Sequence, residues 1–137
     1  MTWALRYARF ALAAAFLSGI ASRFGLYGKD VGYGSFAGFV RYTAEVNAFM
    51  PAATIPFLAW AATAAELGLG ILLLTGYRLR IVAFLSAALL ALFGTAMAIS
   101  FGIKEPLDYS VYSASAAALL LGLTAAHSSS QRSENAP

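Results

Sequence analysis

The stretch FLAWAATAAELGLGILLLT, residues 57–75, decides the fold. It is apolar throughout except for Glu66 near its middle, and it contains no cation to neutralise that carboxylate. Pro56 precedes it and Gly76 follows it, which is typical of the start and the end of a helix. Its length is close to the ~20 residues that cross a bilayer at ~1.5 Å per residue. The stretch therefore predicts a membrane-spanning helix with an acidic side chain inside it.

The composition extends this prediction to the whole chain. Of its 137 residues, 61% are hydrophobic and 11% are charged, whereas an ordinary soluble domain has about 25% charged residues. Three further apolar segments, at 3–22, 81–101 and 109–126, are long enough to span a bilayer as helices. The predicted fold is an all-α integral membrane four-helix bundle. We expect a transmembrane domain at 1–126 and a polar, disordered tail at 127–137.

The first segment also has features of a signal peptide. Arg6 and Arg9 precede an apolar stretch, and small residues follow at 19–21. Cleavage would leave only three spans, so we expect a retained helix.

The basic residues predict the orientation of the bundle. The short link at 76–80 contains Arg78 and Arg80 and no acid, whereas the cations on the opposite side have acids nearby. With this link in the cytoplasm, both termini are also cytoplasmic. Scattered cations of this kind indicate no nucleic-acid site.

The loop at 24–56 begins rich in glycine and then becomes amphipathic. After Ser35, a plausible N-cap, apolar side chains share one helical face opposite Arg41 and Glu45, and Pro51 would end the helix. The apolar face consists of Phe36, Phe39, Val40, Thr43, Val46 and Met50. We expect a short interfacial helix between the first two spans, lying either on lipid or as a lid over the outer mouth of the bundle.

Small residues recur every four positions in the last two spans. They are Ala83, Ala87, Ala91 and Thr95 in one span and Ser110, Ala114, Ala118, Gly122 and Ala126 in the other. Such faces let helices approach closely in lipid. We favour packing within one chain over the alternative, a seam between the chains of a homo-oligomer.

Glu66 is the main candidate for a functional residue. A carboxylate inside hydrocarbon costs several kcal/mol unless it is protonated or paired. Three interpretations follow: a protonated acid packed against its neighbours, one half of an ion pair, or a proton- or ligand-handling group in a polar pocket. Trp60, Thr63 and Gly70 are assigned to the same helical face.

The partner of Glu66 should be a cation from another segment. Arg23, at the outer end of the first span, is the first choice. Arg9 is the second, because its long side chain is better placed to reach the cytoplasmic headgroups.

A second polar cluster lies between the last two spans. Asp108 is expected to cap the fourth helix. Tyr109 and Tyr112 form either an interfacial aromatic belt or the mouth of a pocket that donates hydrogen bonds to a carbonyl ligand.

Several chemistries are excluded by residue type. The chain has no cysteine and one histidine, His127, and it lacks metal-ligand spacing, so no metal site is expected. A haem held by two histidines of one chain is impossible. Any redox role therefore needs a bound small molecule or the cofactor of a partner.

With the spans placed, the chain resembles the DoxX family of small four-helix bacterial membrane proteins over roughly 6–123. The most specific part is AELGLGILLLTG at 65–76, followed by Arg80 and Ala83. Arg23 stands where the family tends to have a basic residue after its first helix. Phe36, Phe39 and Pro51 match the short outer helix of the family. Where broader members carry further polar residues after the fourth helix, this chain has only its short tail.

The resemblance implies a bacterial cytoplasmic (inner) membrane protein, because relatives include subunits of thiosulfate:quinone oxidoreductase. It implies a subunit of, or accessory to, a membrane redox system with a protein partner, with quinone as the non-covalent ligand. Whether the chain is itself an enzyme stays open. On this interpretation Glu66 exchanges a proton, and the ligand is bound by Arg23, Trp60, Thr63, Tyr109 and Tyr112. The alternatives are a non-catalytic anchor or assembly scaffold for a soluble partner, and a small-solute carrier coupled through Glu66.

Overall fold

A computed structural model of the chain describes residues 2–137; Met1, the first residue of the predicted domain 1–126, lies outside the described part. Residues 2–137 contain helices and no strand, which confirms the predicted all-α fold. The elements are α1 (Trp3–Arg23), α2 (Phe36–Val46), the 3-10 turn η1 (Ala52–Thr54), α3 (Ile55–Thr75), α4 (Leu79–Phe101), α5 (Lys104–Asp108) and α6 (Val111–Glu134).

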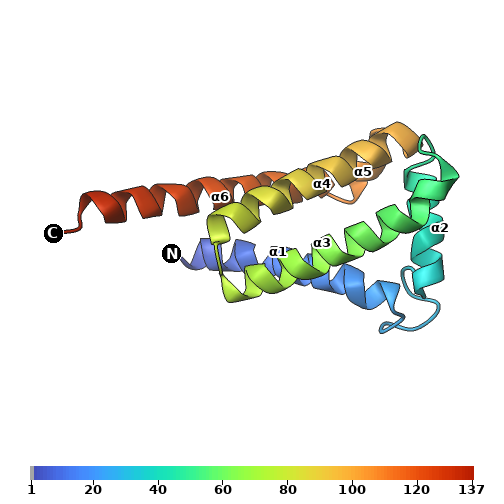
Figure 1. Cartoon of the computed structure of the whole chain (residues 1–137), viewed down its shortest axis with the longest axis horizontal. Helices are drawn as coiled ribbons and strands as arrows, with labels where there is room; N and C mark the ends of the chain where they lie inside the picture. Colours follow the sequence, from blue (N-terminus) through green and yellow to red (C-terminus); the bar gives the residue numbers. More distant parts are fainter. Residues whose placement is uncertain (1) are drawn as a thin grey trace.

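The four long helices α1, α3, α4 and α6 are long and apolar enough to cross a membrane. They run side by side, with α2 across one end of the bundle (Figure 1). We call this the α2 end. The opposite end, the terminal end, holds both chain termini and the turn between α3 and α4 (Figure 1). The chain therefore has the architecture of a multi-pass membrane protein.

The ends of the helices follow from local sequence. Ser35 caps α2, and its hydroxyl accepts the Gly38 N–H at 3.1 Å. Pro56 lies in the first turn of α3, where a missing N–H costs nothing. Gly76 ends α3 at φ 73°, in the left-handed region that glycine adopts without a Cβ penalty. Helix α2 ends at Val46 rather than Met50, and Pro51 instead begins η1.

The bundle consists of two helix pairs. Helix α1 packs mainly on α3, and α4 packs mainly on α6, with fewer contacts between the pairs. In the α4–α6 pair the Ser115 hydroxyl donates to the Ala87 carbonyl at 2.7 Å. A Cβ on Gly122 would lie 2.8 Å from the ring of Phe84, so only glycine fits there without a shift. The middle of each predicted small-residue face is buried within the chain, whereas the ends at Thr95 and Ser110 are exposed.

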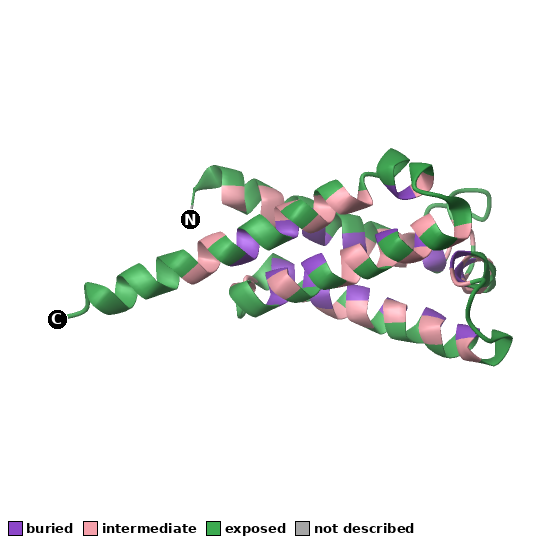
Figure 2. Ribbon diagram, turned by 90° about the horizontal axis from the view of Figure 1, so that it is seen from above, coloured by how far each residue is buried: buried purple, intermediate pink, exposed green. Residues whose placement is uncertain are grey.

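Buried positions lie where the helices face one another, and exposed positions lie on the outside of the bundle (Figure 2). The buried core is apolar, but many large apolar residues are among the exposed ones. Leu73 and Leu121 are fully buried, whereas Leu92 and Leu120 are exposed on the outer surface. An outer surface of this kind is stable in hydrocarbon and unfavourable in water. It agrees with lipid as the surrounding solvent.

Two parts of the chain differ from the expectation drawn from sequence. Helix α6 continues to Glu134, although the polar composition of 127–137 predicts disorder; exposed serine hydroxyls here donate to carbonyls one turn earlier. Asp108 does not cap the fourth helix, because it lies in α5 and pairs with Lys104. The residue before α6 is Ser110, which makes no side-chain cap.

Candidate buried ion-pair site

The central feature of the site is an ion pair between Arg23 and Glu66. Arg23 is the last residue of α1, and Glu66 lies in the middle of α3. Their side chains are 3% and 10% exposed, respectively. Each charge is thus removed from solvent and neutralised by the other, which is the condition under which an ion pair is tolerated in an apolar interior. The structure confirms Arg23 as the partner.

Thr63 also binds the guanidinium of Arg23. Its hydroxyl accepts a hydrogen bond from Arg23 at 3.2 Å and donates one to the Ala59 carbonyl at 2.7 Å. Thr63 and Glu66 lie one turn apart on α3, so the two nitrogens at the tip of Arg23 contact the same helix face. This arrangement fixes the direction of the Arg23 side chain.

Arg9, the second candidate, lies at the far end of the same helix pair. Its Nη1 would be 2.6 Å from a Cβ on Gly76, so it contacts the end of α3 and not Glu66. The Arg9–Gly76 and Arg23–Glu66 contacts together set the antiparallel register of α1 and α3.

Helix α2 covers the ion pair. The ring of Phe39 lies 3.8 Å from the guanidinium carbon of Arg23, within the range of a cation–π contact. Phe39, Thr43 and Val46 are the buried residues of α2. The Ser100 hydroxyl donates to the Val46 carbonyl and so links α2 to α4. Of the two interpretations of the amphipathic segment, the lid over the outer mouth is the one this packing favours.

Tyr33 forms the rest of the cover, and its position depends on local backbone contacts. Its N–H donates to the Ser22 hydroxyl at 2.9 Å, and its ring meets Phe39 edge-on at 5.0 Å. A Cβ on Gly38 would lie 2.1 Å from the Tyr33 carbonyl oxygen, so glycine is required for this approach. The loop is thereby held beside the last turn of α1.

Two phenols at the α2 end are unusually weak acids. Burial raises the pKa of Tyr33, and the nearby Arg23 guanidinium opposes that rise. Burial also raises the pKa of Tyr42 to about 12, with a smaller contribution from Tyr33, whose ring lies 5.2 Å away. Both phenols stay protonated near neutral pH and are available as hydrogen-bond donors.

Arg23 retains one unused donor. Within residues 2–137, its buried Nε has no hydrogen-bond partner. An unpaired buried donor is costly, and Nε of Arg9 at the terminal end is unpaired in the same way within that range. A carbonyl or carboxylate oxygen is the matching chemistry.

The other sequence-predicted residues are not brought together with the ion pair. Trp60 is 57% exposed, and its ring packs on Phe36 with centroids 4.3 Å apart. Tyr109 is 69% exposed. Tyr112 packs against Gly94, and its hydroxyl lies 3.4 Å from that of Thr95. Only Arg23, Thr63 and Glu66 of the predicted set form one cluster.

Sequence reasoning did not assign Tyr33, Tyr42 and Phe39 to the site. Phe39 was detectable, because it is on the apolar face of the amphipathic segment that follows Arg23. Tyr33 gave no such signal, since its position comes from the folded glycine-rich loop. No group of three potential metal ligands occurs anywhere in the described range 2–137.

Comparison with known families gives one finding. The DoxX family model matches residues 4–101, which includes α1 from its second residue, all of α2, α3 and α4, and the whole ion-pair site. Searches of curated proteins and of solved structures give no match to the chain.

Proposed function

The chain belongs to the DoxX family, and from this premise we propose that it is an integral membrane subunit of, or accessory protein to, a membrane redox system. One observation carries the proposal: an arginine and a glutamate are kept buried in an apolar bundle, where an apolar pair of similar size would be equally stable or more stable. Ionisable groups retained inside a membrane bundle mark functional sites by default. Shared fold alone would not justify this step.

We further propose a quinone head group as the ligand of this site. A quinone is an amphipathic molecule that reaches the site from the bilayer, and its carbonyl oxygens accept hydrogen bonds. The free Nε of Arg23 and the protonated phenol of Tyr33 are the donors that match it. Glu66 is the group that would exchange a proton, and the electrons would come from a partner, because this chain offers no redox-active residue pair or metal cluster within 2–137.

The test is quinone retention by the purified protein. Wild-type protein should carry quinone that mass spectrometry detects, and Glu66→Gln and Arg23→Gln should lose it. Lys104→Gln, in the exposed pair at the same end, is the matched control and should retain it. Equal quinone content in wild type and Glu66→Gln would contradict the role of the site.

A non-catalytic anchor or scaffold is the second candidate. The observation that favours it is the mutual satisfaction of the ion pair, which joins α1 to α3 beneath α2 without any ligand. On this proposal a soluble oxidoreductase copurifies with the chain. Glu66→Gln that still folds should then keep the partner, whereas a quinone-contacting subunit should lose quinone-dependent electron transfer with that partner still bound.

The cellular setting is part of the proposal. We place the protein in a bacterial cytoplasmic membrane with its terminal end in the cytoplasm. Five arginines lie at this end, and Glu134 is the one acid there among residues 2–137; the arginines are Arg6, Arg9, Arg78, Arg80 and Arg132.

A further inference from the structure

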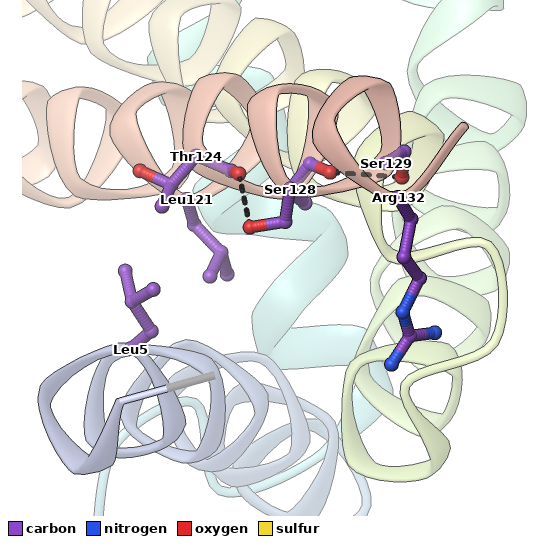
Figure 3. A pocket seen from close by; sticks show the side chains of 7 residues that line it. Leu5, Leu121, Thr124, Ser128, Ser129 and Arg132 are labelled. Atoms are coloured by element: carbon purple, nitrogen blue, oxygen red, sulfur yellow. Dashed lines mark hydrogen bonds between the residues drawn. The ribbon is translucent and has the colours of Figure 1, made fainter. Parts of the chain in front are cut away.

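The terminal end of the bundle holds a pocket between α1 and α6. Its volume is about 250 Å³, and it is lined by Leu5, Leu121, Thr124, Ala125, Ser128, Ser129 and Arg132. Figure 3 shows Leu5 of α1 facing Leu121 of α6, with the hydroxyls and Arg132 further along α6. The pocket is therefore apolar toward the bundle and polar toward the chain end.

A second hollow of about 290 Å³ continues around α6. It is lined by Arg78, Leu79, Arg80 and Ile81 of the α3–α4 turn and by Ala125 and Ser129, which also line the first pocket. In Figure 3 the Arg132 side chain leaves α6 toward this turn. We call the two connected hollows the basic groove.

The cations of the basic groove have no acidic partner. Both ion pairs of the described chain lie at the α2 end. Arg78, Arg80 and Arg132 make no ion pair within residues 2–137. Their positive charges remain available to an external anion.

Positive charge at the end of a membrane helix often does no more than set topology. The basic groove differs because its two hollows, which share Ala125 and Ser129, place arginines beside an apolar wall. A free anion would use the arginines and leave the wall uncovered, since the hydroxyls of Ser128 and Ser129 already donate to helix carbonyls. A molecule with an anionic head and a hydrocarbon chain matches both features.

We propose that the basic groove is a binding site for an anionic phospholipid. Its phosphate lies between Arg132 and Arg80, with Ser129 beside it, and its acyl chain runs along Leu5 and Leu121. This site is at the opposite end from the ion pair and does not depend on the proposed redox function.

The test uses the full chain in detergent, titrated with dioleoyl phosphatidylglycerol or dioleoyl phosphatidylcholine and read by native mass spectrometry. We expect the anionic lipid to bind at least about tenfold more tightly. Arg80→Gln/Arg132→Gln should weaken its binding roughly tenfold or more, since each cation near a lipid surface contributes a factor of about five. Lys29→Gln/Arg41→Gln, which removes the same charge from exposed residues of the α2 end, should change it less than about twofold.

A variant that keeps the net charge distinguishes binding in the groove from a general attraction of anionic lipid to positive charge. Ser129→Leu keeps the net charge and fills the point shared by both hollows, so it should also weaken phosphatidylglycerol binding. The proposal is overturned if both double variants weaken binding equally or if Ser129→Leu has no effect. Displacement of the lipid by millimolar inorganic phosphate would likewise overturn it, because the site would then take the ion alone.

Discussion

Arg23 and Glu66 can both be buried in an apolar interior because each neutralises the charge of the other. Glu66→Gln leaves the Arg23 guanidinium buried without a counter-charge and should lower the free energy of unfolding by about 3–5 kcal/mol. The double variant Arg23→Met/Glu66→Leu removes both charges and should regain that loss in full. A double-mutant cycle of denaturation in mixed micelles measures the coupling.

The exposed pair Lys104–Asp108 provides the control for this cycle. Lys104→Gln should change stability by less than about 1 kcal/mol, because solvent screens exposed pairs. If Glu66→Gln and Lys104→Gln cost the same, the buried pair contributes no more than a surface contact.

The raised pKa of Tyr42 predicts how the stability of the fold changes at alkaline pH. Its folded-state pKa of about 12 lies above the ordinary value of 10.0, so the folded chain holds the phenol proton more tightly than the unfolded chain does. The resulting stability is fully present below pH 10 and is lost as pH rises through about 12. Thermal unfolding between these pH values should show this loss, and Tyr42→Phe should reduce it. Tyr7→Phe, at the terminal end of the bundle, is the control for the removal of a phenol.

At the residue scale, the cost of burying charge was enough to predict the partner of Glu66 from the sequence. The position of Trp60 was assigned wrongly to the same face. At about 100° per residue, six residues turn Trp60 some 120° away from Glu66, whereas Thr63 stays within reach. Tyr33 escaped prediction because contacts of Ser22 and Gly38, rather than a periodic pattern, hold its loop.

The α4–α6 pair shows how small residues act at the scale of whole elements. Gly122→Ala places a Cβ against Phe84, so the ring must shift, at a cost of about 1–3 kcal/mol. Gly68→Ala, within α3, meets no atom within 4 Å and should stabilise its helix by up to about 1 kcal/mol. Thermal denaturation of both variants distinguishes the two effects; a loss of stability in both would show that any added methyl is harmful in this bundle.

The long helices were predictable because each appears in the sequence as an apolar run long enough to cross a bilayer. The last two also show small residues at a helical spacing. Helix α5 was not predictable, since its five residues are too few to show a period. Its formation moves Asp108 into an i,i+4 pair with Lys104 and away from the start of α6. The helical extension of α6 to Glu134 has local hydrogen bonds as its support, which composition does not reveal.

For the whole molecule, the proposed orientation predicts a cytoplasmic C-terminus. Green fluorescent protein fused after Pro137 should fluoresce, and alkaline phosphatase at the same position should be inactive, because the enzyme needs the oxidising side of the membrane. Fusions to a chain ended at Gly28, in the loop before α2, should give the reverse pattern. Phosphatase activity at the C-terminal fusion would contradict the proposed topology.

The division into two helix pairs also governs how the protein is made. Arg23 and Glu66 are 43 residues apart, a distance that a ribosome covers in roughly 2–9 s at about 5–20 residues per second. Phe39 and Thr63 lie between them, so the whole ion-pair site belongs to the first pair of helices to leave the ribosome. The nascent chain can therefore neutralise its two unfavourable charges before α4 and α6 have followed α3 into the membrane.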